Sequence, residues 1–146
     1  MMISLSKAMT TDEKIDSIVK RYQALPRDFN SPESLTYAQQ QLVCLLWDYV
    51  KEVGELYELS KGAEAARKVA FEREKLRLIG ENESVAAADA KAKEAISSMV
   101  FSEIEADVRY KAASLRLTAA RDVYQAIYQH ISSLKQEKRF IMQGGA

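Results

Sequence analysis

The chain has 146 residues, and its 21 Lys or Arg are balanced by 21 Asp or Glu, so the formal net charge is zero. This length suits one ordinary domain with a buried core. The zero net charge means that any polyanion-binding surface must be a local concentration of cations. No window approaches the ~18 to 20 consecutive apolar residues of a membrane span, and the first seven residues lack the apolar core of a signal peptide. We therefore expect a soluble cytoplasmic protein with no membrane partner.

The distribution of helix-breaking residues predicts an all-α chain. Only two prolines occur, Pro26 and Pro32, and no strong helix breaker follows them. A first, short helix is predicted over about 11–24, because Thr10 and Glu13 have the spacing of a capping box and Pro26 ends the segment.

A long second helix is predicted over about 32–79. Ser31 can serve as its N-cap, and proline is favoured at the first helical position that follows. At 1.5 Å per residue, such a helix would be ~70 Å long. Gly62 marks the position of a kink if the helix has one, since glycine weakens a helix interior by about 1 kcal/mol relative to alanine.

A turn over about 80–84 and a third helix over about 85–139 complete the predicted plan. Ser84 can cap this last helix, whose first part is rich in alanine. The expected architecture is one helical domain, 1–146, made of a short N-terminal helix and a long antiparallel helical hairpin.

The apolar residues follow helical spacing on both long helices and predict how they pack. On the outgoing helix the stripe repeats every seven residues, at Leu35, Leu42, Tyr49 and Leu56. The predicted stripe of the return helix consists of Phe101, Ile104, Val108, Leu115, Ala119, Val123, Ile127, Ile131 and Leu134. The outgoing stripe is widened beyond one seam by Leu45, Leu46, Val50 and Val53. This excess predicts a homo-oligomer that covers the remaining apolar surface.

Two further residues of this apolar region carry their own expectations. Cys44 stands among leucines and valine, so we expect a small buried side chain rather than a reactive thiol. Trp47 is expected in packing or in a subunit interface.

Charge is strongly segregated along the chain. Residues 61–79 carry six Lys or Arg against three Glu, whereas the segment 80–108 carries two against seven acidic residues. An antiparallel hairpin places these segments side by side, so interhelical ion pairs are one explanation of the basic run. A bound polyanion such as nucleic acid is the other. We call the segment 61–79 the basic run. Its six cations are Lys61, Arg67, Lys68, Arg73, Lys75 and Arg77.

Catalytic patterns are weak in this sequence. His130 is the only histidine, and Ser132 and Ser133 point to different faces of the same helix. Glu103 and Asp107 share a helix face, but the Glu-x-x-His pattern of di-iron bundles is missing. We therefore expect no catalytic residue, no cofactor and no metal site, and hence no enzyme. A carboxylate-based metal enzyme is the least favoured alternative.

The segment Glu64-Ala65-Ala66-Arg67-Lys68-Val69-Ala70, followed by a charged helix to Gly80, resembles the central segment of UvsY-like phage recombination mediators. As an architectural pattern the resemblance covers roughly residues 35–143, and in sequence about 64–80. It implies a helical protein that assembles into a ring in the bacterial host cell and binds single-stranded DNA. It also implies a role in loading a recombinase onto strands covered by single-strand-binding protein.

Within this resemblance, Arg67 and Lys68 match the paired basic positions of the family, and the other four cations of the basic run are added from charge alone. The segment 10–26 has no counterpart, and Glu72 and Glu74 dilute the basic surface. The resulting hypothesis is a non-catalytic, single-stranded DNA-binding recombination mediator. The alternative is a phage protein-interaction module, such as a counter-defence inhibitor or a scaffold, that acts through its apolar stripe.

Overall fold

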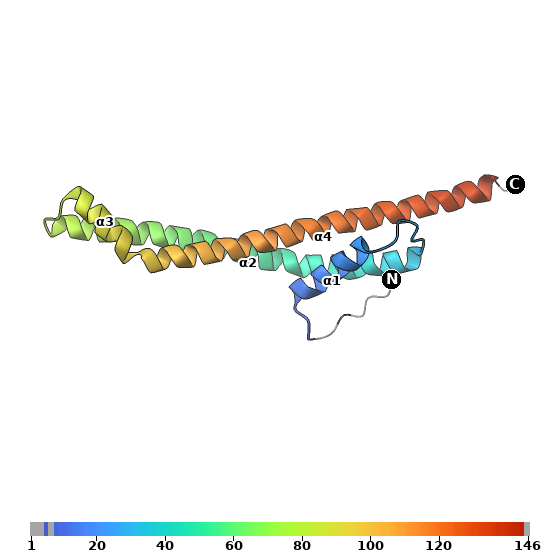
Figure 1. Cartoon of the computed structure of the whole chain (residues 1–146), viewed down its shortest axis with the longest axis horizontal. Coiled ribbons are helices and arrows are strands. Elements are labelled where there is room, and N and C mark those ends of the chain that lie inside the picture. The colour runs from blue at the N-terminus through green and yellow to red at the C-terminus, as the bar shows by residue number, and fades with distance from the viewer. Residues whose placement is uncertain (1–4, 6–7, 145–146) are drawn as a thin grey trace. The chain divides into compact units, whose positions relative to one another are not determined.

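The computed structural model describes residue 5 and residues 8–144 (Figure 1). These residues form four helices and no strand, namely α1 (Thr11–Gln23), α2 (Pro32–Gly80), α3 (Val85–Ala95) and α4 (Ser97–Gly144). The all-α prediction is confirmed. None of the helices described is both long enough and apolar enough to span a lipid bilayer. The N-terminal segment on which the expectation of no signal peptide rests lies, apart from residue 5, outside the described residues.

Helix α1 begins with the capping box that the sequence predicts. The backbone N–H of Glu13 donates to the Thr10 hydroxyl, and the Glu13 carboxylate accepts from the backbone N–H of Thr10. Both donor–acceptor distances are 3.3 Å. The helix buries Ile15 and Ile18 completely. It is thus a short amphipathic helix that packs by one apolar face.

Helix α2 is a single element that continues through Gly54 and Gly62. It ends in a Schellman motif. The Glu83 N–H donates to the Leu78 carbonyl and the Asn82 N–H donates to the Ile79 carbonyl, and both N···O distances are 3.1 Å. Asn82 supplies the left-handed residue of this motif, with φ of 65°. Asparagine tolerates this conformation better than most residues, and Gly80 is the last helical residue.

The return segment differs from the expected single helix over about 85–139. Helix α3 ends at Ala95, and its C-cap residue Ile96 leaves the helical region with a φ of −97° and a ψ of 9°. Helix α4 then runs from Ser97 to Gly144. The Ile96 side chain is buried, and two serines follow it. Serine competes with the helix ladder through its hydroxyl and is favoured at helix starts, so a break at this position agrees with the local sequence.

The chain divides into two compact units where one domain was expected. The first comprises residues up to Glu52 together with those from Ser114 onward, and the second is Val53–Ala113. In the second unit, the ring centroids of Tyr57 and Tyr110 lie 5.2 Å apart, and Lys75 lies near Asp89. The later residue on α2, Lys75, thus pairs with the earlier residue of the return segment, Asp89. The helices of this unit are therefore antiparallel.

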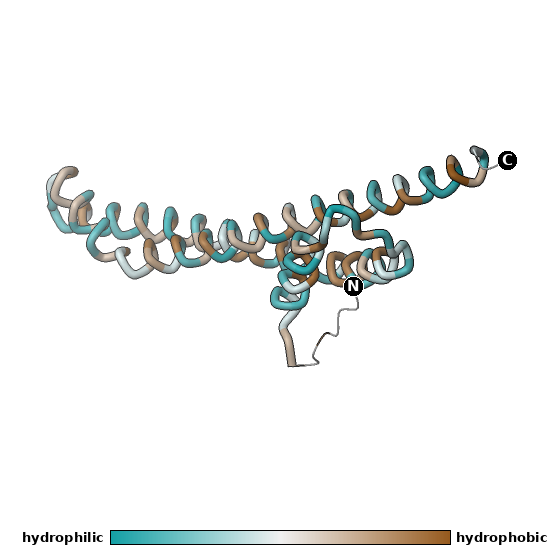
Figure 2. The backbone as a smooth tube through the Cα atoms, turned by 45° about the vertical axis from the view of Figure 1, so that its right-hand side comes forward, coloured by the Kyte–Doolittle hydropathy of each residue, from teal (hydrophilic) through white to brown (hydrophobic). Residues whose placement is uncertain are grey.

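The cores of the two units differ in side-chain size. Figure 2 shows hydrophobic and hydrophilic turns alternating along the helices. The largest fully buried side chains, all in the first unit, are Ile15, Ile18, Leu35, Leu42, Tyr49 and Ile127. The buried residues of the second unit include the small side chains of Ser60, Ala88, Ala92 and Ala113. Small residues let backbones approach closely but bury less apolar area per residue.

Several predicted core positions are wrong. Phe101, Ile104, Val108 and Leu115 are exposed, and the buried positions of this part of α4 are Ala113, Leu117 and Ala120. The sequence offers two apolar stripes on α4, and packing selected the one with smaller residues. Tyr49 is buried as predicted.

The apolar run in the first half of α2 likewise buries only some of its residues. Leu42, Leu46 and Tyr49 face the core, and helical geometry therefore turns Cys44 and Trp47 outward. The expectation of a buried Cys44 is wrong. Trp47 is 76% exposed and so is mostly left uncovered by the part of the chain that the structure describes.

Candidate nucleic-acid interface

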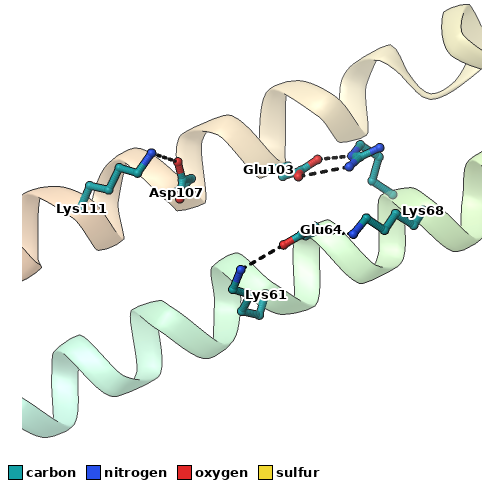
Figure 3. A network of polar contacts seen from close by, with 7 residues as sticks. Lys61, Glu64, Lys68, Glu103, Asp107 and Lys111 are labelled. Carbon is teal, nitrogen blue, oxygen red and sulfur yellow. Dashed lines mark hydrogen bonds and ion pairs between the residues drawn. The ribbon is translucent and has the colours of Figure 1, made fainter.

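All six cations of the basic run lie on α2 within the second unit. Two of them share one carboxylate, since Lys61 Nζ lies 3.3 Å and Lys68 Nζ 2.7 Å from the oxygens of Glu64 (Figure 3). Hydrogen bonds from Lys68 and Lys61 lower the pKa of Glu64, and the bond to Glu64 raises the pKa of Lys61. The two lysine side chains remain 57% and 62% exposed, so both can still be reached from solvent.

Arg67 is oriented differently, toward α4. Its Nε and Nη2 both donate to the carboxylate of Glu103, with 3.5 Å between Nη2 and Oε1. Both side chains are half-buried. This is the interhelical ion pair that the charge segregation predicts, and it limits the access of any ligand to the Arg67 guanidinium.

The cations nearest the turn are paired as well. Lys75 Nζ lies 3.7 Å from Asp89 on α3 and 5.8 Å from the ring centroid of Phe71, a distance that allows a cation–π contact. Arg77 Nη2 lies 2.6 Å from Glu74 Oε1, and Arg77 Nη1 lies 2.7 Å from Glu81 Oε1. Its hydrogen bond to Glu74 raises the pKa of Arg77 and lowers that of Glu74.

Arg73 alone of the six makes no ion pair with a described carboxylate. The cations do not form one continuous patch either. Their seven-residue spacing places Lys61, Lys68 and Lys75 along one side of α2, whereas Arg73 and Arg77, four residues apart, share another side. Of the predicted site residues, the structure therefore brings together Lys61 and Lys68 most directly.

Facing this part of α2, α4 contributes carboxylates that are also engaged by cations. Glu103 binds Arg67, and Asp107 lies 2.8 Å from Lys111 (Figure 3). A hollow of about 350 Å³ is lined by charged side chains of both helices, Lys61, Glu64, Arg67, Glu103 and Asp107. Because its three carboxylates outnumber its two cations, the hollow itself is unsuited to holding phosphate. Among the described residues no group of three or more potential ligands is arranged to hold a metal ion.

The single histidine lies in the first unit and contacts backbone. His130 Nε2 lies 2.8 Å from the Phe29 carbonyl oxygen, and its ring meets that of Tyr22 at a centroid distance of 6.3 Å. As the donor in this contact, Nε2 would carry a proton. These contacts anchor the loop between α1 and α2, as expected for a structural residue.

Comparison of the chain with protein-family models, with curated proteins and with solved structures found no match.

Proposed function

We propose that this protein is a non-catalytic, single-stranded DNA-binding accessory factor of recombination, similar to the UvsY-like mediators. The observation that carries the proposal is the concentration of six cations within residues 61–77 of α2, two of which, Lys61 and Lys68, are well exposed beside each other. In this proposal it acts in the cytoplasm of a phage-infected bacterium. Its protein partners are a recombinase and single-strand-binding protein.

The ion pairs of the basic run are compatible with DNA binding. Glu64 pairs with Lys61 and Lys68 over one helical turn, and such exposed pairs typically contribute only 0.2 to 1 kcal/mol. A DNA phosphate can therefore replace the carboxylate at little cost, and the counterions that leave the DNA favour the exchange. Each patch is weak, but several copies in one assembly bind a strand through avidity.

The assembly in this proposal is a homo-oligomer of long helical hairpins. Its support is an exposed apolar stripe on α2, formed by Val43, Trp47 and Val50 at spacings of four and three residues. We call these three residues the tryptophan stripe. It replaces the stripe expected from the sequence, because Leu46 and Val53 are buried within the chain.

Binding to a labelled single-stranded oligonucleotide, measured by fluorescence anisotropy over a series of salt concentrations, tests the proposal. Lys61→Ala combined with Lys68→Ala should weaken binding and make the plot of log K against log salt shallower by about 1.4, at ~0.7 for each lost phosphate contact. Glu64→Gln should strengthen binding, because it releases both lysines from their carboxylate.

The matched control is Lys111→Ala, which removes an exposed, ion-paired lysine outside the basic run. It should leave the affinity nearly unchanged. Absence of wild-type binding at low salt would refute the proposal. An unaltered affinity of both the lysine double variant and Glu64→Gln would show that Lys61 and Lys68 only pair with Glu64 and do not contact DNA.

The second candidate function is a protein-interaction module, for example a phage counter-defence inhibitor or scaffold. The exposure of Trp47 within an apolar stripe favours it, because tryptophan is enriched among the anchors of protein interfaces. This function requires no oligonucleotide binding, so the same titration separates the two candidates.

A further inference from the structure

One face of the C-terminal half of α4 combines cations with an exposed aromatic ring. Arg121, Tyr128 and Lys135 follow one another at seven-residue intervals, and Arg139 lies one turn beyond Lys135. All four side chains are exposed, and Tyr128 is exposed to 58%. At 1.5 Å per residue they extend over ~27 Å of the helix. We call these four residues the α4 stripe; they belong to the first unit, whereas the basic run belongs to the second.

The cations of the α4 stripe have no acidic partner among the described residues. Earlier cations of α4 do have partners, since Arg109 pairs with Glu105, Lys111 with Asp107, and Arg116 with two aspartates. The acidic residues closest in sequence to the α4 stripe, Asp122 and Glu137, fall on other sides of the helix at 100° per residue. The stripe is thus a surface of uncompensated positive charge.

The helix dipole does not explain these cations. Lysine and arginine are favoured in the last turn of a helix, where they interact with the negative end of the dipole, and the effect falls off beyond that turn. Helix α4 continues to Gly144, and its last turn contains no basic residue. Arg121 lies more than six turns before the helix end.

We propose that the α4 stripe is a second binding surface for single-stranded nucleic acid, in which the three cations contact phosphates and Tyr128 stacks on a base. A cationic track with an aromatic ring is the combination that holds single strands without reading their sequence. Arginine can bind a phosphate through two parallel hydrogen bonds, and lysine through its point charge. The inference rests on the proposed function only for the choice of ligand.

The neighbours of the α4 stripe argue against an anionic membrane as its ligand. A helix that lies in a membrane surface needs a broad apolar face beside its cations. Gln125 and Ser132, which flank this face on one side, are polar, and the half-buried Tyr124 and exposed Met142 on its other side do not form a broad apolar face. Nucleic acid needs only charge and the ring.

The experiment uses the full chain and a labelled oligothymidine of about 16 nucleotides. This is longer than the ~27 Å of the stripe even at the ~3.4 Å per nucleotide of a duplex strand. The triple variant Arg121→Ala, Lys135→Ala, Arg139→Ala should bind at least about tenfold more weakly at ~0.1 M salt, with a salt slope shallower by about 2. Tyr128→Ala should lose about fivefold or more, whereas Tyr128→Phe, which keeps the stacking ring, should bind like wild type.

The lysine double variant of the basic run, measured in parallel, separates this inference from the proposed function. Weakened binding by the double variant but not by the α4 variants overturns the α4 stripe and leaves the proposed function intact. The reverse result supports the stripe and removes the basic run as the contact surface. Absence of binding by wild type overturns both, as does binding only to vesicles that contain anionic lipid. Circular dichroism should show unchanged helicity, because every substituted side chain is exposed.

Discussion

Arg116 shows how one residue can connect three helices of the first unit. Its Nη1 donates to Asp12 on α1 and to the Tyr49 hydroxyl on α2, and both of these distances are 3.2 Å. Its Nε donates to Asp16 at a distance of 3.0 Å. The hydrogen bonds to Tyr49 and Asp16 raise the pKa of Arg116, and burial raises the pKa of the Tyr49 phenol. The guanidinium thus attaches α1 to the two long helices.

Arg116→Ala is expected to destabilise the fold by roughly 2 to 3 kcal/mol, because hydrogen bonds to charged groups contribute about 1.5 to 3 kcal/mol each and removal of the donor leaves the buried Tyr49 hydroxyl without it. Urea unfolding followed by circular dichroism measures the change. Arg109→Ala is the matched control, since its ion pair with Glu105 is exposed and should contribute less than about 1 kcal/mol. Equal effects of the two substitutions would contradict a connecting role for Arg116.

At the scale of elements, the end of α2 and its interior glycines follow different rules. The turn after α2 depends on Asn82, which adopts the positive φ that a Schellman motif requires. Gly54 and Gly62, by contrast, have helical neighbours on both sides and open space where a Cβ would lie. These glycines therefore serve no local structural need within the described chain.

Gly62→Ala should raise the free energy of unfolding by about 0.5 to 1 kcal/mol, because alanine loses less backbone entropy in a helix interior and meets no atom within 4 Å. Thermal and urea unfolding measure this stabilisation. Asn82→Ala serves as the opposite case and should destabilise, since alanine lacks the short polar side chain with which asparagine tolerates a φ of 65°. A destabilised Gly62→Ala would indicate that α2 bends there in solution.

At the scale of the whole molecule, the tryptophan stripe bears on assembly. Trp47 is the single tryptophan of the chain, and its 76% exposure leaves most of a large apolar side chain in water. Burial of such a side chain in an interface would recover roughly 25 cal/mol for each Å² of apolar area. Self-association is therefore expected to remove Trp47 from solvent.

We expect analytical ultracentrifugation to give a mass above that of the monomer, and Trp47 fluorescence to shift to the blue as protein concentration rises. Trp47→Ser should lower the association state by removing the centre of the stripe. Val69→Ser, which removes an exposed apolar residue from the second unit, should not. A wild-type monomer at micromolar concentration, with tryptophan emission independent of concentration, would contradict the proposed oligomer.

Much of the fold could be predicted from local sequence, because its signals act over one or two helical turns. The capping box of Thr10 and Glu13 placed the start of α1, and Pro32 the start of α2. The stretch without proline after residue 32 predicted long helices, since little in it interrupts the backbone ladder. The break at Ile96 depends on weaker preferences, and the sequence alone did not indicate it.

The choice of buried face required the tertiary structure. Phe101, Ile104 and Val108 have helical spacing, but so do the smaller residues that α4 buries, and local propensity cannot choose between two stripes on one helix. The same holds for the candidate site. The order of charged residues along the chain identified the basic run, because the local excess of cations can be counted in the sequence. Which of them pair with carboxylates, as Arg67 does with Glu103, depends on residues 36 positions apart that only helix packing brings together.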